Sequence, residues 1–401
     1  MKIKGRGPKY ILIILTTLLL LFLPSIVQDI LQPSFLRGNH IQIPEEIDDG
    51  LETTSLASVG MDESFLIELL KDLDEIEDHR IHSLLIIKDG KLVFEEYFPG
   101  EKFNLAQFTG ETGFTMEDTH NLCSVTKSFT SAILGIALDQ GHIRSVNQRV
   151  SEFFPEHSDL FINHPERQEL TLENLLTMTS GLDWDDESTS YFDAENDMHQ
   201  MFTSQDPIEY ILSKDIVITP GSVFEYSNCN TNLIGEIIHI ATGMRIDEFA
   251  ERFLFSKLGV VDFEWQMISE NVVFTSGDLR LRPRDMAKFG YLFLNYGEWQ
   301  GETVISQDWI DQSTSMHIDL DSPPNFVDWA DGYGYQWWMW EDIHGVDFQA
   351  YFASGWGGQW IIISPELQLV VVSTAGNYYS PVKMPIETLL TEYILPSIES
   401  N

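Results

Sequence analysis

Cysteine is nearly absent from this chain. Its two cysteines, Cys123 and Cys229, do not have the CxxC spacing of a zinc or thioredoxin site. They remain two buried thiols or, in an oxidising compartment, form a disulfide. The chain also lacks an H-E-x-x-H zinc motif, a Walker A loop and a dinucleotide-binding fingerprint. We therefore expect neither a metal ion nor another cofactor.

Basic residues are scarce too. Lys and Arg number 23 against 63 Asp and Glu, which gives a formal net charge of −40. So acidic a chain repels the phosphate backbone, which excludes nucleic acid as a partner, and an anionic membrane surface repels it as well. With 43% hydrophobic and 12% aromatic residues, the chain is still apolar enough to fold as one large domain or two intimate subdomains.

A long apolar run occurs near the N-terminus. Cations at positions 2, 4, 6 and 9 precede an apolar run over residues 10–23 that extends through residues 24–27. This order is typical of a signal peptide or a membrane anchor, and the run is about long enough to span a bilayer. Either alternative for residues 1–30 predicts an extracytoplasmic protein, membrane-anchored or secreted, that contacts the membrane through this segment only. Residues 31–58, with scattered Pro, Gly and acids, are predicted to be a tether.

Residues 59–398 show the periodicities of a single mixed α/β domain. Apolar residues recur at helical spacing over 61–77, and two strands flank Asp89-Gly90, a strong hairpin turn. The predicted central helices are 124–140, 171–178, 206–213, 230–242, 245–257 and 283–296. Predicted strands at 333–340, 347–355, 358–364 and 367–374 precede a last helix over 381–395. We expect one antiparallel sheet made from both chain ends, with a helical insert over about 121–315.

A serine and a lysine open the first central helix. Ser124 and Lys127, in the sequence SVTK, are three residues apart and hence on one helical face. The free N–H groups and positive dipole of a helix start favour a developing alkoxide, and desolvation can turn a lysine into a base. The alternative is an N-cap serine beside a solvated lysine. The next residues, SFTSAILGIALDQG, favour the first interpretation, because a helix that is apolar all round is buried.

Two later segments carry groups that can assist such a pair. Tyr226 and Asn228, in YSN, offer a phenol that can relay a proton and an amide that can hold a lysine ammonium and a substrate carbonyl. Alternatively, Asn228 or Asn230 caps the helix over 230–242. The sequence ASGWGGQ, over 353–359, is a glycine-rich turn between strands. It can bring a backbone N–H to an oxyanion, or it is simply a tight hairpin.

An acidic segment is predicted at the rim of the cleft. Asp183 and Trp184, followed by acids at 185–187, are expected to form this rim loop. Acids at 193, 195 and 197 alternate like calcium ligands, but the central glycine of an EF-hand is missing, so we predict a solvated loop. The tryptophans at 337, 338 and 340 are expected to pack within a strand.

SVTK, YSN and the late glycine-rich strand follow the order of the three motifs of serine β-lactamases and penicillin-binding proteins, and the chain resembles that family. The tyrosine of the second motif is similar to the class C branch, as are LENLLTMTSGLDW, PGSVFEYSN and GWGGQWIIISPELQLVVV. The resemblance covers about residues 60–395. Within the family, the chain is most similar to the carboxylesterases and 6-aminohexanoate-dimer hydrolases.

This resemblance implies a fold and a set of roles. The fold would be an α/β (α+β), β-lactamase/transpeptidase-like fold, with the site between a sheet domain and a helical domain. Ser124 would be the acylated nucleophile, Lys127 its base and Tyr226 the proton relay. The oxyanion hole would consist of the backbone N–H groups of Ser124 and Trp356. If WGG is the true counterpart of the third motif, the second N–H would come from Gln359.

The third motif departs from the family pattern, because Ala353 stands where Lys or His is usual. The residues expected to bind substrate are Asn228, Ser354, Gly355, Asp183 and Trp184. The leading function is extracytoplasmic hydrolysis of a small ester or amide through an acyl-enzyme, with neutral or cationic substrates favoured. The alternatives are a D-amino-acid peptidase or β-lactamase acting on cell-wall-like substrates, and a catalytically silent binding protein on the same scaffold.

Overall fold

The computed structural model describes residues 40–399, apart from 105, 106, 163, 187, 326 and 380. The chain divides into residues 1–42 and a compact unit that begins at Ile43. The expected anchor or signal peptide lies outside the described residues, and no helix within them is both long and apolar enough to cross a bilayer. Part of the expected tether belongs to the compact unit, since Leu51 is buried and Thr53 forms a β-bridge with Leu92.

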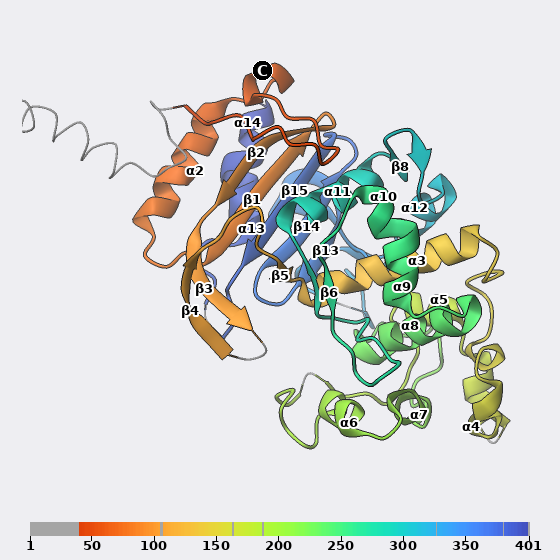
Figure 1. Ribbon diagram of the computed structural model, residues 1–401. Coiled ribbons are helices and arrows are strands. Elements are labelled where there is room, and N and C mark those ends of the chain that lie inside the picture. The colour runs from red at the N-terminus through yellow and green to blue at the C-terminus, as the bar shows by residue number, and fades with distance from the viewer. Residues whose placement is uncertain are drawn as a thin grey trace, which may run out of the picture. The chain divides into compact units, whose positions relative to one another are not determined.

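An eight-stranded sheet runs through this unit in the order β10-β11-β12-β13-β14-β15-β1-β2 (Figure 1). All of its neighbouring strands are antiparallel. Its strands are β1 (Ile81–Lys88), β2 (Lys91–Tyr97), β10 (Ile318–Asp319), β11 (Gly332–Tyr333), β12 (Trp338–Ile343), β13 (Val346–Gly355), β14 (Gln359–Ser364) and β15 (Leu369–Ala375). The shorter strands are β3 (Pro99–Asn104), β4 (Gln107–Gly113), β5 (His120–Asn121), β6 (Glu264–Trp265), β7 (Leu279–Leu281), β8 (Glu298–Trp299) and β9 (Glu302–Thr303).

The two ends of the compact unit meet inside this sheet. β1 pairs with β15 from Ile81↔Ala375 to Lys88↔Leu369. Both strands are buried along their whole length, as expected of runs of Ile, Leu and Val covered on both faces. Figure 1 shows α2 (Glu63–Glu75) and α14 (Leu395–Glu399) on one side of the sheet and α11 (Pro283–Leu294) on the other. The predicted antiparallel sheet made from both chain ends is confirmed.

Most of the α-helices lie between β2 and β10. They are α3 (Thr126–Asp139), α4 (Ser158–Ile162), α5 (Leu172–Leu176), α6 (Asp197–Thr203), α7 (Pro207–Leu212), α8 (Asn228–Thr242), α9 (Ile246–Ala250), α10 (Ser256–Leu258), α11 and α12 (Gln307–Ser313). A last helical stretch begins with α13 (Ile386–Thr388) and ends with α14.

Helix α3 joins the helical part to the sheet part. Every residue from Thr126 to Ala137 is buried, as its apolar sequence predicts. Phe129 stacks on Phe289 of α11 with ring centroids 3.7 Å apart. The hydroxyl of Ser128 donates to the backbone carbonyl of Gln336 at 2.6 Å, which satisfies a polar group in the core. The start of α3 is therefore held rigidly from several sides.

One predicted strand is wrong. The pattern over 333–340 predicts a single strand, but β11 ends at Tyr333 and β12 begins at Trp338. Between them the chain turns: Gly334 N donates to the carbonyl of Trp337 at 2.8 Å, and Gln336 has a φ of +67°. The closely spaced aromatic side chains are buried in either case, so their pattern does not reveal this turn.

Candidate active site

The start of α3 brings a serine and a lysine together. Ser124 lies in a one-turn 3-10 helix, η2 (Cys123–Val125), that leads into α3. Lys127 Nζ lies 3.1 Å from Ser124 Oγ, 2.7 Å from Asn228 Oδ1 and 2.8 Å from the carbonyl oxygen of Ser276. Three acceptors thus replace the water that this amine loses on burial.

The structural alternatives for this pair are wrong. No side chain caps the start of α3, so Ser124 is not an N-cap residue. Lys127 is only 2% exposed and is not solvated. An amine buried beside a hydroxyl has the geometry that a general base requires.

The backbone around Ser124 is unusual on both sides. Cys123 has a φ of +48°, a left-handed conformation that is rare for residues other than glycine, and Asn121 Oδ1 accepts a hydrogen bond from its N–H at 2.8 Å. Gly355, the last residue of β13, packs against this turn. A Cβ on Gly355 would lie 2.3 Å from the carbonyl oxygen of Leu122 and 3.2 Å from Ser124 N. Only glycine permits this approach, so the third motif does reach the serine.

The other residues of the third motif lie in β13, in the turn after it and at the start of β14. Ala353 is buried in the sheet. Ser354 is half-buried and pairs with Trp360 of the neighbouring strand β14. Trp356 follows Gly355 in the turn, and its ring is 43% exposed. Gln359 begins β14, and its buried side chain donates to the carbonyl of Ala375 at 2.7 Å.

Tyr226 lies just before α8 and close to Lys127. Lys127 Nζ is 4.9 Å from the centroid of the Tyr226 ring. Two further neighbours of the ring come from the sheet: it stacks on Trp338 at 5.4 Å and meets Tyr333 edge-on at 6.5 Å. Burial raises the pKa of Tyr333 well above its ordinary value, so this neighbouring phenol stays neutral. The aromatic wall of β11 and β12 therefore fixes the position of Tyr226.

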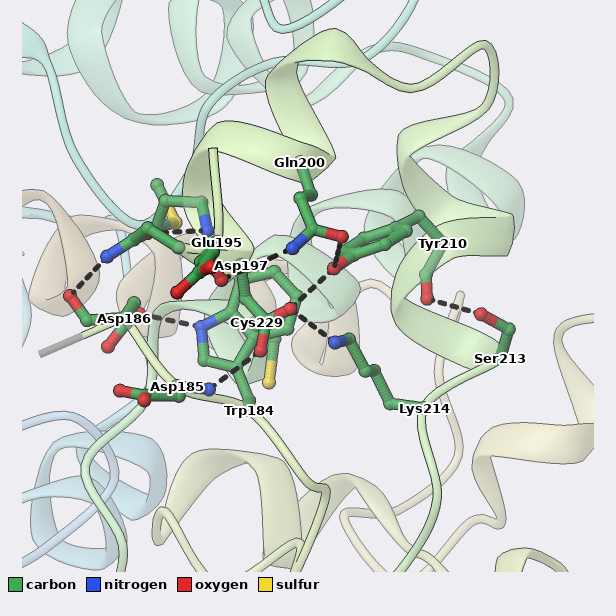
Figure 2. Close-up of polar contacts among 12 residues, drawn as sticks. Trp184, Asp185, Asp186, Glu195, Asp197, Gln200, Tyr210, Ser213, Lys214 and Cys229 are labelled. Carbon is green, nitrogen blue, oxygen red and sulfur yellow. Dashed lines mark hydrogen bonds and ion pairs between the residues drawn. The ribbon is translucent and has the colours of Figure 1, made fainter. Parts of the chain in front are cut away.

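Asn228 is the first residue of α8 and does not cap it. The N-cap is Ser227, with no side-chain hydrogen bond, so the predicted capping by Asn228 or Asn230 is wrong. A further partner, which no sequence pattern indicated, is Asp186, and this residue is 4% exposed. Asp186 Oδ2 accepts hydrogen bonds from Asn228 N at 3.1 Å, Asn228 Nδ2 at 2.7 Å and Trp184 Nε1 at 2.7 Å. Figure 2 shows Asp186 beside Trp184 in this loop.

The two predicted rim residues lie near the YSN segment and not at Ser124. Asp183 is exposed, and its N–H donates to the carbonyl of Asp215 at 2.8 Å. Burial, together with the charge of Asp183, raises the pKa of Glu225, the neighbour of Tyr226. Trp184 is half-buried against the acidic loop.

The cysteines are free thiols in the structure. Burial raises the pKa of Cys123 to about 12 and also raises that of Cys229, so both stay protonated and unreactive. Across the described part of the chain, no three His, Cys, Asp or Glu side chains are grouped as a metal site.

Comparisons with known proteins agree with this geometry. The family model for Beta-lactamase matches residues 71–386. The 6-aminohexanoate-dimer hydrolase of Paenarthrobacter ureafaciens is 24% identical over 253 residues, or 60% of this chain and 59% of that relative. The chain thus matches about three fifths of the length of this relative.

Two solved structures share the fold. A family VIII carboxylesterase has a TM-score of 0.64 at 16% identity, covering 88% of this chain and 99% of that one. The octameric penicillin-binding protein homologue from Pyrococcus abyssi has a TM-score of 0.59 at 21% identity, covering 86% and 78%. Because the family model spans most of the sequence, this chain belongs to the beta-lactamase family of serine hydrolases.

Proposed function

We propose that this protein hydrolyses ester or amide bonds of small molecules through an acyl-enzyme on Ser124. The observation that carries this proposal is the buried Lys127, whose Nζ lies 3.1 Å from Ser124 Oγ. A serine hydroxyl is a weak nucleophile unless a base takes its proton, and a lysine within hydrogen-bond reach can do so. The names of two relatives, a 6-aminohexanoate-dimer hydrolase and a carboxylesterase, support amide and ester substrates.

In the first half-reaction, Lys127 takes the hydroxyl proton while Ser124 Oγ attacks the substrate carbonyl carbon. The negative charge that develops on the carbonyl oxygen is held by backbone N–H groups. Tyr226 gives its phenolic proton to the departing alcohol or amine and takes the proton held by Lys127, and the C–O or C–N bond breaks. In the second half-reaction, water gives up a proton to the same groups and attacks the acyl carbon. Ser124 Oγ then leaves and regains its proton.

The proposed oxyanion donors are the N–H groups of Ser124 and Trp356. The close approach of Gly355 to Ser124 N supports Trp356, the next residue in the turn. Gln359 is the weaker candidate because it pairs with Gly355 inside the β13–β14 ladder. Asn228, Ser354 and Gly355 would contact the substrate, with Asp183 and Trp184 further out.

The site favours neutral or cationic substrates. Ala353 carries no charge at the position where relatives usually have a Lys or His, close to the groups that bind a substrate carboxylate. A neutral donor such as Ser354 makes a hydrogen bond about half as strong as a charge-assisted one. Arg284 is engaged elsewhere, since it donates to both carboxylate oxygens of Glu95, at 2.7 and 2.6 Å.

The test uses variants of the serine, its base and the relay. Ser124→Ala, Lys127→Ala and the double variant should lose similar amounts of activity, because residues that act as a unit are not additive. Tyr226→Phe should lose much of the activity while still folding. A fluorophosphonate should form one adduct, on Ser124. Near-normal turnover by folded Ser124→Ala would contradict the proposal, and absence of any adduct on the wild-type protein would favour a silent binding protein.

We also propose that the compact unit lies outside the cytoplasm and that only residues 1–30 contact a membrane. The basic start and apolar run of that segment support this orientation. Protease added to intact cells or spheroplasts should cleave the region 59–401. Full protection until lysis would contradict this topology.

A further inference from the structure

The hydrogen bonds behind Asn228 fix which way its amide points. A carboxylate only accepts hydrogen bonds, so the group that faces Asp186 at 2.7 Å must be the Nδ2 donor of Asn228. The backbone N–H of Asn228 reaches the same carboxylate oxygen at 3.1 Å. The amide oxygen therefore faces Lys127, at 2.7 Å.

This orientation matters for the lone pair of Lys127. A neutral amine has two N–H groups and one lone pair. The oriented Asn228 Oδ1 and the backbone carbonyl of Ser276 can only accept, so the neutral amine turns its N–H groups toward them. The lone pair is then left for the side of Ser124 Oγ, 3.1 Å away.

We propose that Asp186 is a positioning residue that, through Asn228, directs the lone pair of the neutral Lys127 at the hydroxyl of Ser124. This inference rests on the proposed function, in which Lys127 is the base. Asp186 does not touch the reacting atoms. It prevents the reversed amide, whose Nδ2 would donate to the lone pair and withdraw it from Ser124.

Hydrogen bonds and an ion pair within the loop that carries Asp186 hold the carboxylate of Asp186 in place. Asp197 accepts a hydrogen bond from Asp185 N at 2.8 Å and from Tyr210 at 2.5 Å, and it forms an ion pair with Lys214 (Figure 2). The amide of Asn196 donates to the backbone carbonyl of Asp186 at 3.2 Å. A rigid acceptor is what an orienting role requires.

The first test is Asp186→Ala, which removes the carboxylate oxygen that accepts from Asn228 N, Asn228 Nδ2 and Trp184 Nε1. Both amide orientations then become possible, and the rate constant for acylation of Ser124 should fall about tenfold to a hundredfold with little change in KM. Asp193→Ala, the same change at an exposed position of the same loop, should keep the wild-type rate.

The second test is Asp186→Asn. The backbone N–H of Asn228 and Trp184 Nε1 can only donate, and both reach one atom of the side chain at position 186, so the oxygen of the new amide should take that place and still accept from Asn228 Nδ2. Asn228 then keeps its orientation without a charge at position 186. We expect this variant to keep most of the wild-type acylation rate.

Fluorophosphonate labelling of Ser124, followed by mass spectrometry across pH, reads out both tests, with Ser124→Ala as the blank. If the wild-type protein forms no adduct, the proposed function fails. If it labels normally but Asp186→Ala labels at the same rate with the same pH profile, the positioning role is overturned. Should Asp186→Ala not fold, Asp186→Asn decides: a folded Asp186→Asn variant that stays slow at every pH also overturns the role, because its amide oxygen would still orient Asn228.

Discussion

The contact between Gly355 and the turn before Ser124 should be the most sensitive point of the site. In Gly355→Ala the new Cβ would lie 2.3 Å from the carbonyl oxygen of Leu122, against an ordinary contact of about 3.5 Å. The end of β13 and the serine turn must therefore separate by about 1 Å. A displacement of this size between reacting groups can cost about a hundredfold in rate, and we expect that loss in kcat/KM.

The fold should survive this change. Overpacking by one methyl group costs about 1–3 kcal/mol. The shift in Tm is this free-energy cost divided by the entropy of unfolding, and for a unit of this size it is a decrease of only about 1–4 °C. We therefore expect a loss of activity with little loss of stability, because the strain falls on the proposed oxyanion donors beside Ser124 and not on the core.

The assay is hydrolysis of p-nitrophenyl butyrate, with Tm measured by circular dichroism on the same samples. Gly113→Ala is the matched control, since a Cβ added there meets nothing within 4 Å. It should change neither quantity. If Gly355→Ala retained a kcat/KM close to that of the wild-type protein, the close approach of β13 would not be what shapes the oxyanion site.

Three further predictions concern stability, substrate and redox state. Burial, with a smaller effect of Glu95, raises the pKa of Glu96 to about 8. The folded state thus keeps a proton that the unfolded state releases above pH 4.5, and wild-type stability falls as pH rises toward 8. Glu96→Gln should therefore gain about 2–3 kcal/mol relative to wild type between pH 4.5 and 7 in urea unfolding, and a constant difference would refute this. Short-chain aryl esters should exceed nitrocefin in kcat/KM by orders of magnitude, and efficient nitrocefin turnover without esterase activity would show that another cation replaces the one missing at Ala353. Alkylation of the unfolded, unreduced protein should label both Cys123 and Cys229, whereas no label would reveal a disulfide.

Local patterns were enough to find the central pair. The uncharged stretch after Lys127 predicted a buried helix, and a buried lysine needs acceptors, so its contact with a nearby serine could be anticipated. The sheet from both chain ends was also predictable, because strand patterns occur at both ends of the domain and helical patterns lie between them.

The supporting contacts were not predictable in the same way. Asp186 stands in a run of acids, and nothing local shows which of them turns inward to meet a partner 42 positions away. The carbonyl of Ser276 is a backbone group, so no residue type marks its contact with Lys127. The glycine-rich turn was predicted to bring a backbone N–H to an oxyanion, but only the structure shows that Gly355 packs against the turn before Ser124.

Because the sheet is built from both ends of the domain, it has a consequence for the stage of synthesis and folding at which activity is expected. The buried hydroxyls of Ser83 and Thr374 are 2.6 Å apart in space and 291 positions apart in sequence. Closing a loop of that length costs about 5 kcal/mol in chain entropy, so the pairing of β1 with β15 is a late event that other contacts must offset. During synthesis, Ser124 and Lys127 leave the ribosome more than 200 residues before Gly355 does. A nascent chain would therefore carry the proposed nucleophile and base without the proposed oxyanion strand, and we expect it to become a hydrolase only after Gly355 has been made.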